Sequence, residues 1–159
     1  MSSNATIIGI ILFLVFVVPI FYAIIKSKAN KRNVEQLKAQ LIAQHQLTPT
    51  DTFEDFGIQH FILDANAKKL LHLEIVKSKI TQQNLWTIND LKSLKADYSH
   101  YTSPTNESII GKIHLRITKK DGDQSAILIY DENTGNMALV SEYRNSVENL
   151  VSKVNSLRG

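Results

Sequence analysis

The sequence predicts an N-terminal single transmembrane α-helix followed by an α+β domain with about seven antiparallel strands and one C-terminal amphipathic helix. Three observations indicate this fold class. Residues 6–25 carry no charge, the hydrophobic period becomes two after residue 53, and a helical period returns from residue 141. We therefore divide the chain into a short tail at 1–5, a transmembrane helix at 6–25, a basic flank and helical linker at 26–52, and a β domain at 53–159.

The predicted anchor reads TIIGIILFLVFVVPIFYAII over residues 6–25. A bilayer core of roughly 30 Å is crossed by about twenty apolar residues in a helix. A cleaved signal peptide begins with basic residues and ends at small ones, whereas this start is uncharged and no Ala-x-Ala follows Ile25. Buried helices of globular domains rarely stay apolar on every face for this length. We expect a retained membrane anchor.

Basic residues follow the predicted anchor directly, and none precedes it. Lys and Arg concentrate on the cytoplasmic side of membranes, so we expect a single-pass protein of the cell membrane with its N-terminus outside and its C-terminal domain cytoplasmic. These side chains are also candidate contacts for the headgroups of the lipid bilayer: Lys26, Lys28, Lys31 and Arg32.

The net charge of +3 is concentrated next to this flank. Residues 26–45 hold five Lys and Arg against Glu35 alone, while residues 46–159 hold 13 Lys and Arg against 14 Asp and Glu. A near-neutral domain has no long-range attraction for a polyanion, which argues against nucleic-acid binding. The absence of cysteine excludes disulfides, thiol catalysis and thiolate metal sites.

Residues 30–46 are rich in helix formers and carry a narrow apolar stripe of Val34, Leu37 and Leu41. The stripe covers about two heptads, fewer than a coiled coil usually needs. Two interpretations remain open: these residues are oligomer contacts, or the helix is a stalk that lies on its own domain. Pro49 disfavours helical geometry at Thr48 and should end the helix.

The β domain shows short segments of β-forming residues separated by turn residues. The clearest is residues 109–118, where Ile113, Leu115 and Ile117 alternate with polar residues before an Asp121-Gly122 turn. The C-terminal helix is predicted over 141–158, with Ser141 as N-cap. The expected strand segments are 58–64, 70–76, 84–88, 94–98, 109–118 and 125–130, with a short piece at 137–140.

This order of elements resembles the pleckstrin-homology-like superfold of small bacterial membrane-anchored proteins. The resemblance lies in the opening hairpin at 58–76, the segment LWTINDL at 85–91 and the helix from Ser141. It implies a bent barrel closed by the C-terminal helix. Members that bind phosphoinositides carry basic residues around the first hairpin, which makes four lysines candidate lipid contacts here: Lys68, Lys69, Lys77 and Lys79.

No motif indicates a catalytic, cofactor or metal site. The five histidines, His45, His60, His72, His100 and His114, lack ligand spacing, although His60 and His72 could face each other across the first hairpin. Phosphate-binding glycine loops and serine-hydrolase motifs are missing, so an enzyme and a small-molecule substrate are disfavoured. The basic strand residues Lys112, Arg116, Lys119 and Lys120 are either a solvated face or a second headgroup contact.

Three functional hypotheses follow. The leading one is a non-catalytic, membrane-anchored interaction module whose cytoplasmic domain binds another protein, as an accessory or scaffold subunit of a membrane protein complex. The second is peripheral recognition of anionic lipid headgroups. The third is a homo-oligomeric membrane scaffold that assembles through residues 34–45.

Overall fold

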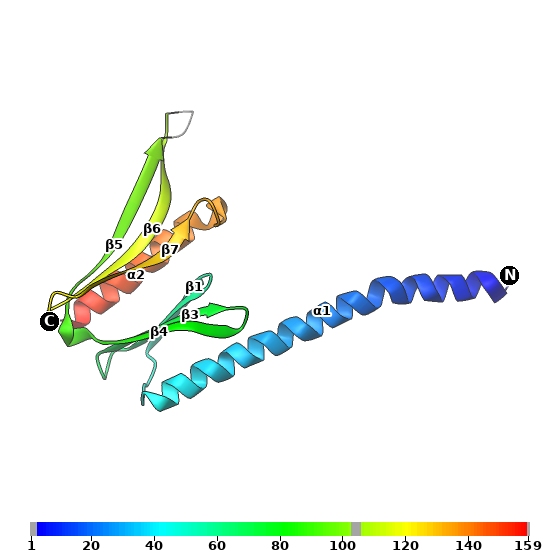
Figure 1. The fold of residues 1–159 in the computed structure, drawn as a ribbon, viewed down its shortest axis with the longest axis horizontal. Coiled ribbons are helices and arrows are strands. Elements are labelled where there is room, and N and C mark those ends of the chain that lie inside the picture. Colours follow the sequence, from blue (N-terminus) through cyan, green and yellow to red (C-terminus); the bar gives the residue numbers. More distant parts are fainter. Residues whose placement is uncertain (1–2, 103–105, 159) are drawn as a thin grey trace.

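The computed structural model describes residues 3–102 and 106–158, with side chains from residue 13 onward except those of residues 14 and 55. One long helix comes first, strands follow, and a second helix comes last (Figure 1). The bounds are α1 (Ser3–Gln44), β1 (Asp51–Phe56), β2 (Gln59–Asp64), β3 (Lys69–Val76), β4 (Lys79–Thr87), η1 (Ile88–Asp90), β5 (Leu91–Thr102), β6 (Ser108–Lys119), β7 (Gln124–Asp131), η2 (Met137–Leu139) and α2 (Val140–Leu157).

The strands form two antiparallel sheets, each made of consecutive strands. The four-stranded sheet has the order β1-β2-β3-β4, and the three-stranded sheet has the order β5-β6-β7. The chain passes from one sheet to the other at η1, where the N–H of Lys120 donates to the carbonyl of Asp90 at 2.8 Å. From this corner the two sheets diverge, as Figure 1 shows.

The predicted bent barrel is wrong. In the part of the chain that the structure describes, no backbone ladder joins the two sheets. The edge strands of one sheet therefore do not pair with those of the other, and the sheets do not form a closed barrel. The physical reason is the position of α2, which packs against β1 and β5 and thereby fills one of the two sides at which the sheets would meet. The other side lies between the edge strands β4 and β7.

The predicted transmembrane helix is also corrected. Among the residues searched, no helix combines the length and the hydrophobicity that a membrane span requires. The described apolar stretch of α1 runs only from Phe13 to Ile25, and Lys26 follows it. Residues 6–12 and 14 of the predicted anchor lie outside the residues with described side chains.

The main core lies between the two sheets and α2. Phe61, Leu70 and Leu115 from the sheets are fully buried there with Val147 and Leu150 of α2. Lys153 of α2 pairs with Asp51 of β1, which holds the helix against the first strand. One continuous apolar core therefore joins elements that are far apart in sequence.

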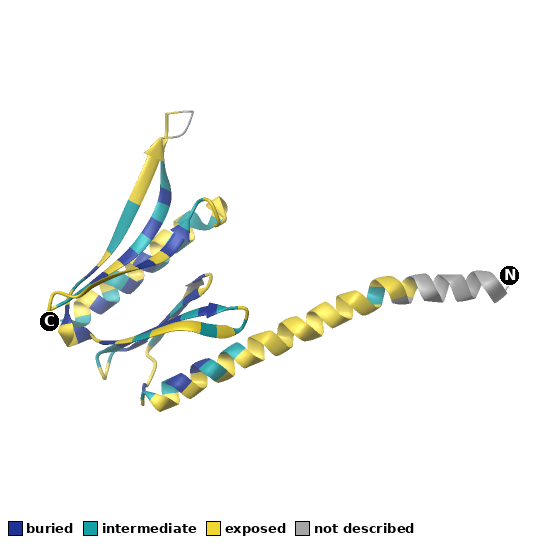
Figure 2. Ribbon diagram, viewed as in Figure 1, coloured by how far each residue is buried: buried dark blue, intermediate teal, exposed yellow. Residues whose placement is uncertain are grey.

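A second apolar cluster covers the outer face of the four-stranded sheet. Leu41 of α1 packs there with Ile62, Leu71 and Leu73, and Val34 borders the cluster. Both faces of β2 and β3 are thus buried, which explains their nearly continuous burial. Figure 2 shows the consequence for α1, whose described side chains from residue 18 to residue 33 are exposed and become buried only near its C-terminal end.

A partly buried ion pair fixes α1 on this sheet. Lys38 is only 4% exposed, and its Nζ lies 2.7 Å from a carboxylate oxygen of Glu54 on β1 and 3.4 Å from Glu35. The hydrogen bond from Lys38 is the main reason that the pKa of Glu54 falls below its ordinary value. The end of α1 is therefore part of the domain.

Candidate functional site

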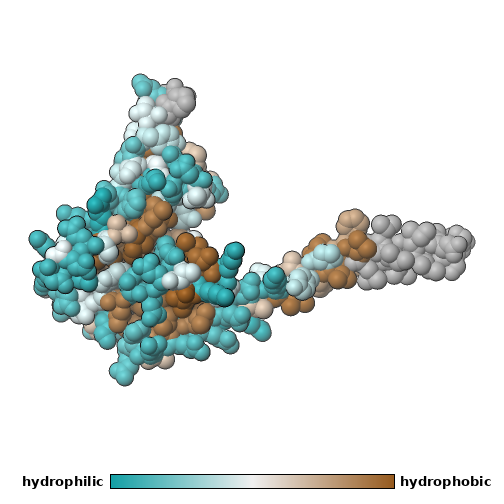
Figure 3. Space-filling model, in the orientation of Figure 1, coloured by the Kyte–Doolittle hydropathy of each residue, from teal (hydrophilic) through white to brown (hydrophobic). Residues whose placement is uncertain are grey.

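A groove of about 300 Å³ opens between the two sheets on the side that α2 leaves uncovered. The inner face of the four-stranded sheet forms its floor, and β7 borders it on the other sheet. Figure 3 shows hydrophobic side chains gathered on the face of the molecule between the upper and the lower sheet. The lining residues are Ile58, Gln59, Glu74, Gln82, Asn84, Trp86, Ser125, Ala126, Ile127 and Leu128.

The strands β4 and β7 line the groove in different ways. The residues that line the groove from β4 are Gln82, Asn84 and Trp86, which alternate and therefore share one face of that strand. The residues from β7 are consecutive, 125–128, as expected where a strand is approached along its edge. β7 pairs only with β6, so among the described strands its other edge has no partner. The groove thus meets an open backbone edge on β7 and side chains on β4.

A hydrogen-bonded polar network forms the floor of the groove. Glu74 accepts from Thr81 Oγ1 at 2.6 Å and from Gln59 Nε2 at 3.1 Å. Because Gln59 donates to Glu74, its Oε1 accepts from His72 Nε2 at 2.6 Å, and His72 Nδ1 then accepts from Asn84 Nδ2 at 3.2 Å. The carboxylate therefore sets the orientation of every group in the network.

The network keeps its histidine neutral and its carboxylate charged. Burial lowers the pKa of His72 to about 4, and the ring stacks between Phe61 and Trp86. The hydrogen bonds from Thr81 and Gln59 lower the pKa of Glu74. At neutral pH the floor of the groove therefore carries one negative charge, and in the described part of the chain no cation pairs with it.

The rim of the groove is apolar and open to solvent. Ile58 and Leu128 are 48% and 42% exposed on opposite sides, while Trp86 is 7% exposed beneath them. Large apolar side chains at the rim of a polar-floored groove are typical of a binding surface. No local pattern in the sequence indicates this groove, because its lining residues come from strands that are far apart in the chain.

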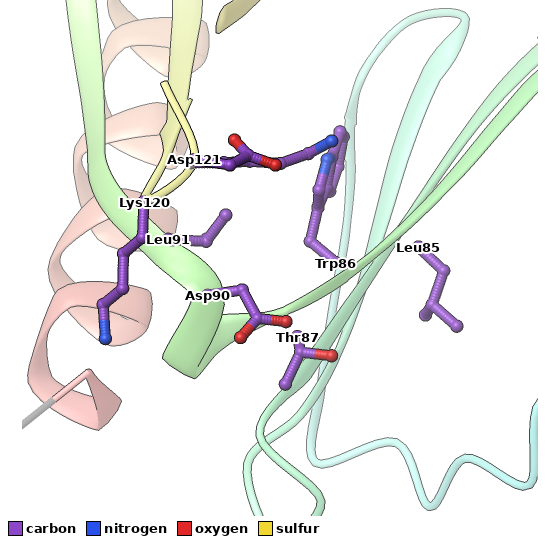
Figure 4. A pocket seen from close by; sticks show the side chains of 8 residues that line it. Leu85, Trp86, Thr87, Asp90, Leu91, Lys120 and Asp121 are labelled. Carbon is purple, nitrogen blue, oxygen red and sulfur yellow. The ribbon is translucent and has the colours of Figure 1, made fainter. Parts of the chain in front are cut away.

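A second hollow, of about 480 Å³, lies at the corner between the sheets (Figure 4). The lining residues are Leu85, Trp86 and Thr87 of β4 together with Asp90, Leu91, Lys119, Lys120 and Asp121. The charges here are of both signs and do not converge on one point. We see no chemistry that this hollow supports.

The structure divides the eight candidate lipid contacts into separate groups. Lys68 and Lys69 lie at one end of the hairpin β3–β4, and Lys77 and Lys79 at the other, which is about 25 Å away for an eight-residue strand. The four therefore cannot contact one headgroup together. Lys77 and Lys79 share their end of the sheet with Val34 of α1, since Val34 packs on the cluster that includes Ile75 and Ile80.

The basic face of β6 is largely neutralised by its neighbours. Lys112 lies 2.8 Å from Asp131, Arg116 lies 2.7 Å from Asp97 and Lys119 lies 2.6 Å from Asp123. These pairs favour the solvated-face interpretation over a second headgroup contact.

The predicted oligomer contacts Val34 and Leu41 face their own domain. Leu41 is 9% exposed in the cluster on the four-stranded sheet, and Val34 packs against that cluster. Leu37 is half-buried. The structure therefore favours the stalk that lies on its own domain.

The histidines do not form a metal site in the described part of the chain, where no group of three or more possible ligands occurs. His72 faces the interior with Phe61, whereas His60 lies on the α1 side, where burial and then the charge of Lys38 lower its pKa. The expectation that His60 and His72 could face each other is wrong, because adjacent positions of paired strands point to opposite faces.

No protein-family model, no curated protein and no solved structure matches this chain. The groove and its charged floor are thus the features from which a function can be inferred.

Proposed function

We propose that this chain is a non-catalytic interaction module that binds another protein in the groove between its two sheets. It would serve as an accessory or scaffold subunit of a larger complex. The observation that carries the proposal is the open groove itself, which combines exposed apolar rim residues with an oriented polar floor. Both ring nitrogens of His72 are occupied by hydrogen bonds and its pKa is about 4, which disfavours a role as general base.

The test is purification of the tagged full-length chain from the cells that make it, followed by native mass measurement and identification of the co-purified proteins. We expect a stoichiometric partner. Leu128→Asp should weaken its binding at least about tenfold, because Leu128 lies on the rim and a carboxylate there opposes an apolar contact.

The matched control is Met137→Asp, because Met137 is 52% exposed and lies outside the groove. It should retain the partner. Recovery of the chain alone at monomer mass would contradict the proposal, and so would a partner that Leu128→Asp leaves bound.

A second candidate function is contact with anionic lipid headgroups at the end of the sheet where α1 departs. Exposed basic side chains occur there on two segments, the turn between Ile75 and Ile80 and the helix residues that precede Val34, which packs beside those isoleucines; none of them forms a salt bridge with a described residue. The five are Lys28, Lys31, Arg32, Lys77 and Lys79. Lysines near an anionic surface each contribute about 1 kcal/mol.

Single-cysteine labelling tests this candidate, since the natural chain has no cysteine. A fluorophore at Ser78→Cys should be quenched by headgroup-quencher lipids in phosphatidylserine vesicles, and a fluorophore at Asn66→Cys should not. Reversal of Lys77 and Lys79 to Glu should abolish that quenching. Equal quenching in phosphatidylcholine vesicles would contradict an electrostatic contact.

A further inference from the structure

The groups in the groove that lack a binding partner indicate what kind of protein segment could bind there, an inference that rests on the proposed function. Two features remain without partners in the described residues: the open backbone edge of β7 over 125–128, and the charge on Glu74. A ligand that satisfies both needs backbone amide groups in an extended conformation and a cationic side chain.

The backbone edge calls for an extended segment. A strand edge offers alternating N–H and C=O groups, and peptides recognised in this way add as one more strand. The four consecutive residues of β7 at the groove span about 13 Å, the length of a four-residue extended segment. An α-helix satisfies its own backbone groups and would leave this edge unpaired.

The carboxylate of Glu74 calls for a basic side chain. Among the described residues, its hydrogen-bond donors are the neutral groups of Thr81 and Gln59, and a carboxylate has roughly four acceptor sites. His72 is its nearest titratable neighbour on the floor and stays neutral. A negative charge in a partly desolvated groove attracts a cation more strongly than one in open water.

Apolar side chains around the floor can contact the aliphatic stem of such a side chain. Ile58, Trp86 and Leu128 provide apolar surface above the floor. Lys and Arg bury their aliphatic stems along apolar surfaces while the charged head reaches a polar partner. The geometry of the groove thus matches a long basic side chain better than a short one.

We propose that the groove binds an extended segment of a partner protein, which adds as a strand to the edge of β7 and inserts a Lys or Arg side chain toward Glu74. The side chains of the bound segment alternate in direction, as in any strand. Its basic side chain points to the floor of the groove, and the side chains on either side of it point to solvent or to the apolar rim.

The experiment pans a phage library of random seven-residue peptides against the immobilised full-length chain. Enriched peptides should share one Lys or Arg position. A synthetic copy of an enriched peptide should bind Glu74→Gln at least about tenfold more weakly than the natural chain. Glu142→Gln, which alters an exposed carboxylate on α2 away from the groove, should bind it unchanged.

Strand addition has its own readout. N-methylation of alternate peptide residues removes backbone donors, so methylation on the residues that face β7 should abolish binding and methylation on the others should not. Equal effects on both sets would overturn strand addition.

Failure of this inference can be told apart from failure of the proposed function. The proposal of a basic extended ligand would be overturned if no peptide were enriched, or if the enriched peptides bound Glu74→Gln as tightly as the natural chain. That result would stand even if the binding of a co-purified partner still depended on Leu128. A partner whose binding is unchanged by Leu128→Asp would overturn the proposed function as well.

Discussion

At the scale of single residues, the least expected feature is a histidine buried in the middle of a sheet. His72 is fully buried, and both of its ring nitrogens are hydrogen-bonded to side-chain amides. The network is satisfied only while the ring is neutral, because a second ring N–H would point at the Nδ2 donor of Asn84. Protonation therefore opposes the folded state.

This gives a prediction for stability against pH. The unfolded imidazole has a pKa near 6.5 and the folded one a pKa of about 4, so the unfolded state binds more protons between these values. The stabilisation is fully present above pH 6.5 and is lost as the pH falls toward 4. We expect a loss on the order of 2–3 kcal/mol in urea unfolding measured over this range.

His72→Phe should reduce that pH dependence, because phenylalanine keeps the stacking between Phe61 and Trp86 without a titrating group, and the dependence that remains is due to His60, whose pKa is also lowered by burial. His100→Gln, at an exposed position of β5, should leave the pH dependence unchanged. A flat profile in the natural chain, or an unchanged profile in His72→Phe, would contradict the prediction.

A second residue-scale prediction concerns the turn between β3 and β4. Lys77 and Ser78 have φ of 49° and 62°, a left-handed conformation that a two-residue hairpin requires and that glycine adopts without strain. Ser78→Gly should raise the free energy of unfolding by about 0.5–1 kcal/mol. Ser125→Gly, in the extended strand β7, should lower it, and a gain from both variants would contradict the turn argument.

At the scale of elements, the C-terminal end of α1 is held by one buried charge and a few apolar contacts. Removing Lys38 leaves Glu54 without its cation, but Glu54 is half-exposed and water can compensate part of the loss. We expect Lys38→Ala to weaken the docking of residues 34–44 by about 1–2 kcal/mol, which corresponds to roughly tenfold faster amide exchange there.

Hydrogen exchange measured by mass spectrometry checks this, and Lys31→Ala is the control because Lys31 is exposed. Faster exchange over the whole chain in Lys38→Ala would mean global destabilisation. Unchanged exchange over 34–44 would mean that the ion pair does not hold the helix.

Elements with a clean local period could be predicted from the sequence. The alternation of Ile113, Leu115 and Ile117 locates β6, and the helical spacing of Val147, Leu150 and Val154 predicts a helix over 141–158, where α2 spans Val140–Leu157. The Asp121-Gly122 turn is found with Gly122 at a φ of 96°. These features depend on neighbours a few residues apart, which a sequence displays directly.

Features that depend on distant elements could not be predicted in this way. β3 places Leu71 and Leu73 under α1 and His72 and Glu74 toward the groove, so its polar residues resemble solvent-facing ones although they lie inside. Whether two sheets close into a barrel depends on pairing between strand edges, which leaves no local pattern. The groove escaped prediction for the same reason, because β4 and β7 meet only in the folded chain.

At the scale of the whole molecule, α2 determines which side of the domain is open. It packs between β1 and β5, and its residues Val147, Leu150 and Val154 are fully buried in the core that both sheets share. No described backbone ladder joins the sheets, so their relative position depends on this helix and on the corner at η1. The groove between β4 and β7 exists because α2 occupies the opposite side.

A cavity in the shared core under α2 tests this dependence. Leu150→Ala removes buried methyl groups from the shared core and should lower the free energy of unfolding by about 2–5 kcal/mol. Because one core joins both sheets, the fluorescence of Trp86, the only tryptophan, and the far-ultraviolet circular dichroism should change in one coincident transition. Val151→Ala, at a half-buried position of the same helix, should cost less. If Leu150→Ala instead separates the two signals, so that the environment of Trp86 survives while strand content is lost, the sheets are independent units and α2 does not set the width of the groove.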